Sequence, residues 1–238
     1  MKRIVIIGGG AAGLAAAISA SEKYKNQAEV TLIEKNERPA RKVMITGKGR
    51  CNVTNNCNVD TLIANVPKNG KFLYSAFSGF TPKDVISFFE TAGVPLKTER
   101  GNRVFPVSDK AVDIVDALVK TAKSGGTKFI NATAAEILAA NGSLVGVKVT
   151  DGRVISADSV ILATGGMSYP LTGSTGDGYK MAQKLGHTVT ELKPSLVPLC
   201  IHEGFCTKIA GLSLKNVTLS IFETGKKKPL FSEMGEML

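Results

Sequence analysis

Three glycines near the start of the chain have the spacing of a phosphate-binding turn. Gly8, Gly10 and Gly13 form a GxGxxG motif between an apolar run and an alanine-rich segment. The first glycine makes the tight turn, the second lets a pyrophosphate approach the backbone, and the third lets helix and strand pack closely. The following helix N-terminus adds free N–H groups and a positive dipole end. The motif predicts a bound dinucleotide; the alternative is a glycine-rich turn without a ligand.

An acidic residue stands where such a site needs one. Glu34 lies 21 residues after Gly13, at the end of a run that we expect to form a strand over residues 30–34. With a strand over residues 2–7 and a helix over residues 14–23, this makes one βαβ unit. A carboxylate there would accept hydrogen bonds from a ribose and repel a 2′-phosphate. NADP is therefore not expected in this half of the site.

A second small-residue motif follows a later strand. Residues 160–166 read VILATGG, a buried strand that ends in small side chains and permits close passage of a ligand. Residues 172–179, TGSTGDGY, then lead into a helix expected over residues 178–185. Asp177 and its flanking glycines would offer backbone N–H groups to a phosphate, or a carboxylate to a ribityl hydroxyl. The alternative is a plain helix cap.

The stretch GKGRCNVTNNC, from Gly47 to Cys57, presents two nearby cysteines. A flavin-linked disulfide reductase has four residues between its cysteines and a second GxGxxG, whereas Cys51 and Cys57 are separated by five and no second motif occurs. The intervening asparagines are hydrogen-bonding groups suited to a cofactor. We therefore favour a loop that contacts the cofactor, with a redox disulfide and a plain structural loop as the alternatives.

Composition and charge restrict the function classes. The chain has 238 residues, 43% hydrophobic and 21% charged, which is ordinary for a soluble globular protein. Its four cysteines are too few for a disulfide scaffold, and no apolar stretch is long enough to suggest a membrane span. We expect a cytoplasmic protein. The two histidines, His187 and His202, lack neighbouring ligand-type residues, so no metal site is expected.

The net charge of +10 is unevenly distributed. Residues 35–50 contain one acid, Glu37, and a set of basic side chains: Lys35, Arg38, Arg41, Lys42, Lys48 and Arg50. A basic stretch can attract the phosphates of a cofactor, of a nucleotide substrate or of RNA. The alternative is a solvated surface.

The rest of the chain predicts further elements and a domain boundary. Residues 35–80 are expected to form long functional loops. Helices are expected over residues 82–92 and 109–123, the second capped by Asp109. A strand over 128–131, a meander over 135–157 and a hairpin over 214–231 complete the pattern. Residues 190–200 suggest a boundary, and the ending directly after a strand suggests a fragment or a shortened chain.

Three motifs together resemble a flavoprotein family. The GxGxxG with Glu34 and the later ATGG are similar to the two-part FAD fingerprint of glutathione-reductase-like flavoproteins. ATGG followed by STGDGYKMA is similar to the fumarate reductase and aspartate oxidase branch. RKVMITGKGRCNVTN, ATGGMSYPLTGSTGDGYKMAQKLGH and PSLVPL resemble most closely the BaiN-like, or aminoacetone oxidase, family of FAD-dependent oxidoreductases. Lys48 stands where many members have glycine, and members run to roughly 400 residues.

The resemblance implies a fold, a cofactor and a site. The fold is α/β: a Rossmann-like FAD-binding domain over residues 1–190 with a β-meander, and the incomplete start of a β-rich substrate domain over 191–238. Arg50 and Asn52 are candidates for flavin or substrate contact. The implied cofactor-binding residues are Gly8, Gly10, Ala11, Ala12, Gly13, Glu34, Lys35, Arg41, Lys42, Gly47, Gly49, Arg50, Cys51, Asn52, Ala134, Ala163, Thr164, Gly165, Gly166, Gly176, Asp177 and Gly178.

Several activities are compatible with this reading. The flavin carries the chemistry itself, so no catalytic nucleophile is expected. The first candidate is NAD(P)H-linked hydride transfer through flavin N5 to a small unsaturated substrate, with NAD(P)H visiting transiently. The others are oxidation of a small amine or amino acid, reduction of a base in RNA, and a non-catalytic FAD-binding fragment.

Overall fold

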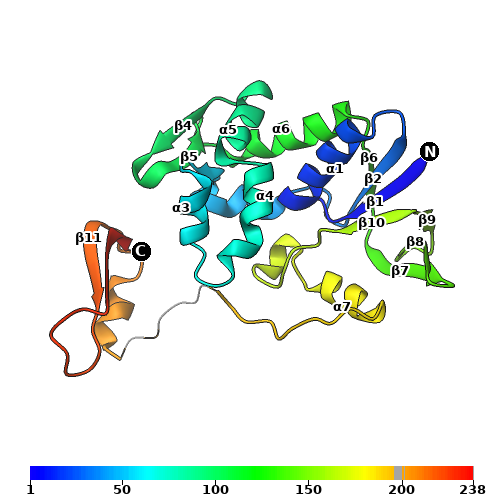
Figure 1. The fold of residues 1–238 in the computed structure, drawn as a ribbon. Helices are drawn as coiled ribbons and strands as arrows, with labels where there is room; N and C mark the ends of the chain where they lie inside the picture. Colours follow the sequence, from blue (N-terminus) through cyan, green and yellow to red (C-terminus); the bar gives the residue numbers. More distant parts are fainter. Residues whose placement is uncertain (196–199, 201, 238) are drawn as a thin grey trace. The chain divides into compact units, whose positions relative to one another are not determined.

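The computed structural model describes residues 1–195, 200 and 202–237 (Figure 1). The chain divides into two compact units, Met1–Val189 and Thr190–Leu238. Of the expected boundary segment 190–200, residues 196–199 lie outside the described residues, as does most of the PSLVPL motif.

The first unit is built on a parallel sheet in the order β10-β1-β2-β6. Its strands are β1 (Lys2–Ile7), β2 (Ala28–Glu34), β6 (Lys128–Asn131) and β10 (Ser159–Leu162). β1 pairs with β10 so that Ile7 lies opposite Leu162, and with β2 so that Ile7 lies opposite Ile33. Because parallel strands end at the same edge, the turns after β1, β2 and β10 open side by side.

Alternate residues of β1 point into two separate cores. Ile4 and Ile6 pack into a cluster with helices α1 (Ala11–Lys23) and α6 (Ala111–Ser124). Val5 and Ile7 pack into a second cluster with the antiparallel meander, whose strands are β7 (Ala134–Ala140), β8 (Ser143–Val149) and β9 (Val154–Ser156). This two-sided burial explains why the strand reads as a continuous apolar run.

The expected elements are largely confirmed in this unit. The structure contains the strand, helix and strand of the βαβ unit. It also contains the meander, whose turns have positive φ at Asn141, Gly142 and Gly152. The expected helix after TGSTG is α7 (Asp177–Lys184), and Gly186 has a φ of 87° just beyond it.

The expectation that residues 35–80 form irregular loops was wrong in part. The segment contains α2 (Arg41–Ile45), the two-residue strand β3 (Thr54–Asn55), α3 (Val59–Ala64) and α4 (Tyr74–Gly79), with 3-10 turns at Thr46–Gly49 and Gly70–Leu73. These helices have five or six residues, too few for an amphipathic period to be visible in the sequence. Asn58 caps α3 by accepting a hydrogen bond from the Thr61 N–H.

A small antiparallel sheet, β3-β5-β4, stands beside α5 (Pro82–Thr91). It contains β4 (Leu96–Glu99) and β5 (Arg103–Pro106). The sequence predicted that Asp109 caps the next helix, and this prediction was wrong. The cap position of α6 is Lys110, and Asp109 has a φ of 57°. Its carboxylate instead pairs with Arg50 and Lys97, which compete successfully with the helix N-terminus.

The second unit contains one hairpin among its described residues. β11 (Leu214–Ile221) pairs antiparallel with β12 (Phe231–Met237). The expected hairpin is confirmed and extends six residues beyond its predicted end at residue 231.

Candidate functional site

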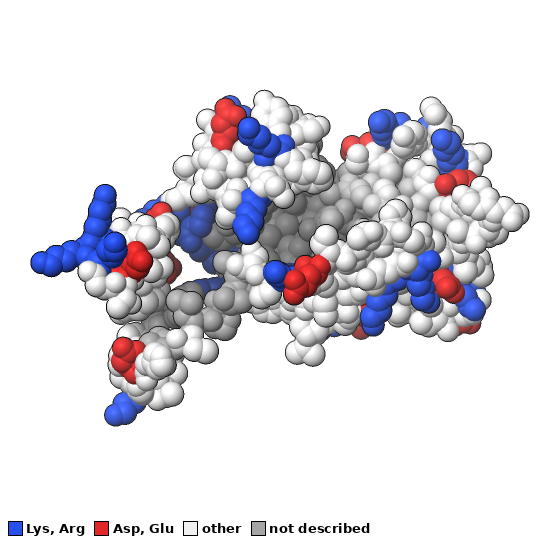
Figure 2. All heavy atoms as spheres, turned by 60° about the horizontal axis from the view of Figure 1, so that its bottom comes forward, with Lys and Arg blue, Asp and Glu red and all other residues white. Residues whose placement is uncertain are grey.

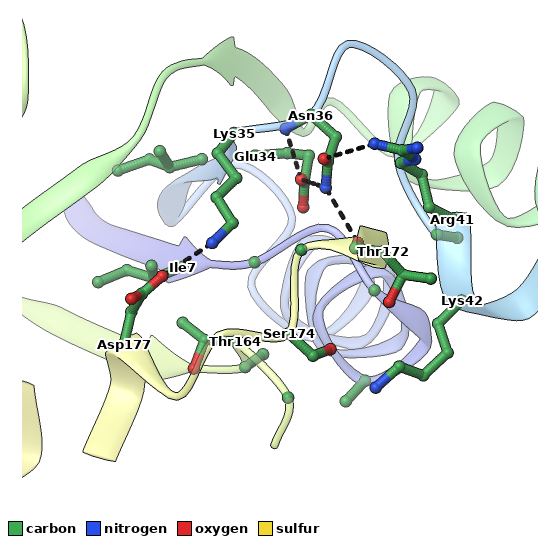
Figure 3. Close-up of a pocket in the computed structure, with 18 of the residues that line it drawn as sticks. Ile7, Glu34, Lys35, Asn36, Arg41, Lys42, Thr164, Thr172, Ser174 and Asp177 are labelled. Atoms are coloured by element: carbon green, nitrogen blue, oxygen red, sulfur yellow. Dashed lines mark hydrogen bonds and ion pairs between the residues drawn. The ribbon is translucent and has the colours of Figure 1, made fainter. Parts of the chain in front are cut away.

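A cavity of about 570 Å³ opens at the carboxyl edge of the parallel sheet, within the first unit (Figure 3). The turn after β1, the residues after β2 and the segment between β10 and α7 form its walls. It contains thirteen of the predicted cofactor-binding residues: Gly8, Gly10, Ala11, Ala12, Glu34, Lys35, Arg41, Lys42, Ala134, Ala163, Thr164, Gly165 and Asp177.

Each of the three glycines of the first turn is needed for a different structural reason. Gly8 has a φ of 105°, and a Cβ there would lie 2.5 Å from the Ala163 carbonyl oxygen. A Cβ on Gly13 would lie 1.8 Å from the Gly8 carbonyl oxygen, so this glycine lets α1 rest on the turn. Gly10 differs, because no atom stands within 4 Å of the position of a Cβ there and the residue lines the cavity. The open space is where a phosphate group can approach the backbone.

The N-terminus of α1 faces this space. Ala11 and Ala12 line the cavity, and the first turn of the helix carries no acidic side chain. Free N–H groups and the helix dipole together make such an end an anion-binding position.

The Glu34 carboxylate is held by its surroundings. One oxygen, Oε2, accepts a hydrogen bond from the Gly9 N–H at 2.6 Å. The other, Oε1, accepts from the Asn36 N–H at 2.7 Å and from Asn36 Nδ2 at 2.6 Å. A carboxylate oxygen has two lone-pair directions, so Oε2 keeps one for a hydroxyl donor. The side chain therefore has a fixed orientation at the edge of the cavity.

Basic side chains stand along one wall. Arg41 Nη1 donates to Asn36 Oδ1 at 3.2 Å, and Lys42 Nζ donates to the Ser168 carbonyl at 2.7 Å. Both residues line the cavity. Their positive charges, added to the α1 N-terminus, make the site suited to a diphosphate.

Lys35 reaches the opposite wall (Figure 3). Its Nζ donates to Asp177 Oδ2 and to Thr175 Oγ1, both at 2.8 Å. Hydrogen bonds from Lys35 and Thr175 lower the pKa of the Asp177 carboxyl, so it is ionised at neutral pH. Asp177 is the first residue of α7, where a carboxylate is favourable toward the helix dipole.

The small residues after β10 position that helix. A Cβ on Gly178 would lie 2.2 Å from Thr164 Oγ1, so this glycine allows α7 to pack against the strand end. Gly165 has a φ of 75° and lies against Ser174. Gly166, Gly176 and Gly178 are not among the cavity-lining residues, although Gly176 is the cap of α7.

Comparison with known proteins identifies the family. A family model described as the HI0933-like protein Rossmann domain matches residues 2–238. The chain belongs to this family. The predicted family and the predicted cofactor, FAD, are thereby confirmed, and the open space at Gly10 beside the α1 N-terminus is a physical fit for the diphosphate of that cofactor.

Two relatives of the HI0933-like chain have names that describe reactions. A 3-dehydro-bile acid delta(4,6)-reductase of Clostridium scindens is 32% identical over 212 residues, covering 89% of this chain and 51% of the relative. A ribosomal RNA dihydrouridine synthase of Escherichia coli is 30% identical over 217 residues, covering 90% of this chain and 52% of the relative. The chain spans about half the length of these relatives.

Solved structures resemble the HI0933-like chain more distantly. The crystal structure of L-proline dehydrogenase from P. horikoshii has a TM-score of 0.47 and 19% identity, covering 79% of this chain and 57% of that one. A glycine oxidase from Bacillus cereus has a TM-score of 0.46 and 12% identity, covering 77% and 59%.

The loop Gly47–Asn52 lies outside the cavity lining. A Cβ on Gly47 would lie 2.9 Å from the Asn52 backbone nitrogen, which keeps the loop tight, whereas Gly49 has open space around it. The Asn52 amide lies beside the carbonyl oxygens of Thr54 and Val104. These internal contacts hold the loop against the β3-β5-β4 sheet.

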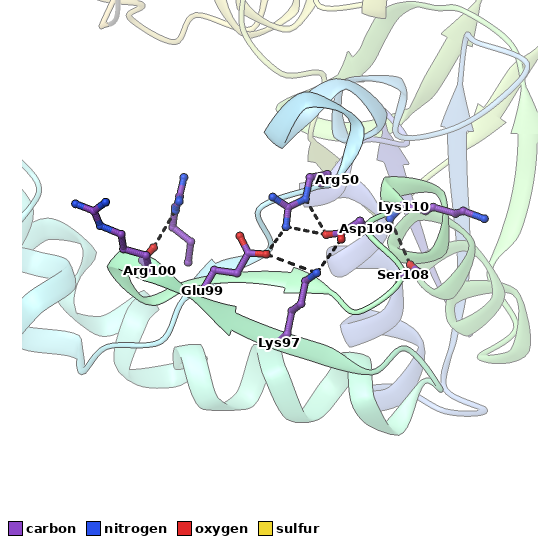
Figure 4. Close-up of polar contacts among 8 residues, drawn as sticks. Arg50, Lys97, Glu99, Arg100, Ser108, Asp109 and Lys110 are labelled. Atoms are coloured by element: carbon purple, nitrogen blue, oxygen red, sulfur yellow. Dashed lines mark hydrogen bonds and ion pairs between the residues drawn. The ribbon is translucent and has the colours of Figure 1, made fainter. Parts of the chain in front are cut away.

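Arg50 belongs to a charged network rather than to the cavity wall (Figure 4). Its guanidinium pairs with Glu99 and with Asp109, and Lys97 Nζ lies 2.8 Å from the other Asp109 oxygen. The guanidinium also lies 4.1 Å from the centre of the Phe105 ring, a cation–π contact. A hydrogen bond from Arg50 lowers the pKa of the Glu99 carboxyl, and hydrogen bonds from Lys97 and Arg50 lower the pKa of the Asp109 carboxyl.

Cys51 and Cys57 are free thiols. Cys51 is 5% exposed and packs in the core with α1 and α6. Burial raises the pKa of the Cys51 thiol, which lowers its thiolate fraction at neutral pH. The structure thus places Cys51 as a packing residue.

Sequence reasoning missed several cavity residues. Asn36, Thr46, Thr133, Thr172 and Ser174 are polar residues that line the cavity without having been predicted. Asn36 directly follows Glu34 and Lys35, and that adjacency was the available signal.

The described residues contain no helix long and apolar enough to cross a membrane. They also contain no group of three or more metal-ligating side chains.

Proposed function

We propose that this protein is an FAD-dependent oxidoreductase that uses NAD(P)H to reduce a small unsaturated substrate. The observation that carries the proposal is the cavity at the turn after β1, with an open Gly10, a fixed Glu34 and basic side chains in its lining. When bound there, FAD supplies a hydride-accepting and hydride-donating N5 atom. The remaining roles belong to residues of the chain.

The proposed roles follow the cavity walls. The N–H groups at the start of α1 bind the diphosphate, and Arg41 and Lys42 offset its charge. The free lone pair of Glu34 accepts a hydrogen bond from the adenosine ribose. Asp177 and the small residues Ala163–Gly165 lie along the ribityl side. We extend the cofactor-contacting region to Gly47, Gly49 and Asn52 on the family resemblance, and treat residues 1–190 as the FAD domain and 191–238 as the start of a β-rich substrate domain.

The direction of the reaction rests on the relatives. The Clostridium scindens protein is a reductase by name and shares 32% identity over most of this chain. An L-aspartate oxidase of Pyrococcus furiosus shares 24% over 77% of the chain, which gives less support to an amine oxidase. Substrate reduction is therefore our first candidate.

Reduction of a base in RNA is a second candidate, favoured by a surface segment. Residues 61–83 contain no acid and carry exposed Phe72, Tyr74 and Phe80 beside Lys68 and Lys71. Aromatic faces and positive charges together suit single-stranded nucleic acid. The dihydrouridine synthase of Escherichia coli is 30% identical to the chain. On the face shown in Figure 2, however, basic side chains are scattered among acidic ones and form no continuous band.

One purification tests the proposal and its rivals. We expect a yellow protein that releases FAD on denaturation and is bleached anaerobically by NADH or NADPH. Reoxidation by a steroid-like enone, but not by oxygen alone, supports the reductase. Peroxide formed with a small amine identifies the oxidase. Salt-sensitive binding of ribosomal RNA supports the second candidate. A protein that stays colourless with added FAD contradicts the proposal.

A further inference from the structure

Asn36 uses every polar group of its side chain inside the cavity wall. Its Nδ2 donates to Glu34 Oε1 at 2.6 Å and to the Thr172 carbonyl at 3.3 Å. Its Oδ1 accepts from Arg41 Nη1 at 3.2 Å. The backbone carbonyl of Asn36 accepts from Asn131 Nδ2 at 2.9 Å. The side chain is partly buried, and it is labelled in the upper part of Figure 3.

These contacts join three parts of the cavity wall, and one of them lies 136 residues away in sequence. Glu34 belongs to the end of β2, Arg41 begins α2, and Thr172 lies in the segment between β10 and α7. The fit is tight on the third side, because a Cβ on Gly173 would lie 2.7 Å from Asn36 Nδ2. An amide can donate to a carboxylate through its NH₂ group and accept from a guanidinium through its oxygen at once.

We propose that Asn36 is the positioning residue for the adenosine half of the cofactor. It orients the Glu34 carboxylate toward the ribose and the Arg41 guanidinium toward the diphosphate, and it ties both to the 172–174 segment. The inference rests on FAD as the cofactor. It assigns to Asn36 no contact with the reacting end, so its loss lowers affinity and leaves flavin chemistry intact.

A residue that merely closes the turn after β2 would behave differently. Its replacement would lower the stability of the apoprotein, and binding would weaken only through misfolding. A positioning residue changes affinity for the adenosine diphosphate group itself. The two roles are therefore separated by measuring binding of FAD and of ADP alone, together with urea unfolding of the apoprotein.

Asn36→Ala and Asn36→Asp are the test variants, and Asn65→Ala and Asn65→Asp are the matched controls. Asn65 is exposed, its amide donates to the Thr61 carbonyl, and it does not line the cavity. We expect Asn36→Ala to weaken the binding of FAD and the binding of ADP by similar factors, roughly 10-fold or more. The reason is that a hydrogen bond to a charged group is lost. The redox potential of the flavin that still binds should equal that of the wild type.

Asn36→Asp keeps the size of the side chain but replaces the amide donor with a carboxylate. This carboxylate faces Glu34 at hydrogen-bond distance, and the repulsion displaces the Glu34 side chain. Arg41 faces the same site, and its cation offsets part of that repulsion. We therefore expect Asn36→Asp to weaken binding of FAD and of ADP at least as much as Asn36→Ala does.

Three results would overturn the inference. The first is FAD and ADP affinity within twofold of wild type in both Asn36 variants. The second is a loss of affinity that is matched by destabilisation of the apoprotein, which indicates a structural residue. The third is wild-type protein that binds no FAD. That last result alone also removes the proposed function, so the two failures are distinguishable.

Discussion

Lys35 and Asp177 form an ion pair that joins two walls of the cofactor cavity. The Lys35 Nζ lies 2.8 Å from Asp177 Oδ2, and the two side chains are 28% and 37% exposed. One residue follows β2 and the other begins α7. The pair therefore holds the wall that follows β2 and the wall at the start of α7 at a fixed spacing, without belonging to the turn after β1.

Breaking this pair should weaken cofactor binding modestly. We expect Lys35→Met and Asp177→Asn each to raise the FAD dissociation constant, with a coupling of about 0.5–1 kcal/mol in a double-mutant cycle, because the pair is partly exposed. Fluorescence titration measures this. Arg3→Met and Asp158→Asn provide the control, since that pair lies outside the cavity lining. Additive effects of the Lys35 and Asp177 changes would show that the pair does not couple the walls.

Gly10 and Gly13 should respond differently to the same substitution. Gly10→Ala meets no atom and has a φ of −75°, so the apoprotein should keep its stability while FAD affinity falls at least 10-fold. Gly13→Ala drives a Cβ into the Gly8 carbonyl and should cost roughly 1–3 kcal/mol of unfolding free energy, as overpacking does. Urea unfolding and FAD titration of both variants check this. Unchanged FAD affinity in Gly10→Ala would contradict the assigned phosphate approach.

Acid should weaken the pair between Arg3 and Asp158. Hydrogen bonds from Arg3 lower the pKa of the Asp158 carboxyl to about 2. A carboxyl with a lowered folded-state pKa stabilises the fold above its unfolded value of 3.8 and loses this contribution as pH falls toward 2. The stability gap between wild type and Asp158→Asn should therefore be present at pH 7 and shrink between pH 4 and pH 2. A gap independent of pH would assign the effect to packing.

Arg50→Met tests whether the Arg50 guanidinium contributes to the stability of the fold or to the binding of the cofactor. The residue pairs with Glu99 and Asp109 and stacks on Phe105, so we expect a lower urea midpoint and FAD affinity within twofold of wild type. Arg41→Met, in the cavity wall, should show the reverse. A loss of FAD affinity at unchanged stability in Arg50→Met would instead place Arg50 at the phosphates or the substrate.

Cys57→Ser should leave the flavin chemistry unchanged. The thiols of Cys51 and Cys57 are free, and the raised pKa of Cys51 disfavours a redox role. Stopped-flow bleaching by NADH would measure the effect. Abolished turnover with FAD still bound would revive the disulfide alternative.

An element or contact was predictable from the sequence where the interactions that cause it lie among neighbouring residues. The βαβ unit was predictable because β1 is buried on both faces and the glycine spacing reports a backbone requirement. The bond from Asn36 to Thr172 was not predictable, since Thr172 lies 136 residues away in sequence. The prediction that Asp109 caps a helix was wrong for the same reason. Its local pattern is typical of a cap, but its carboxylate forms ion pairs with Lys97 and Arg50 instead.

The pairing of β1 with β10 has a consequence for how the protein folds. The Arg3 N–H bonds to an Asp158 oxygen across 155 residues of chain, and Ala163 closes over Gly8 at the same edge. The phosphate turn therefore becomes one wall of a cavity only after a long loop has closed, which is a slow and entropically costly event. FAD that binds the closed state alone draws this equilibrium toward the native fold. Cofactor supply during synthesis should accordingly raise the yield of folded protein.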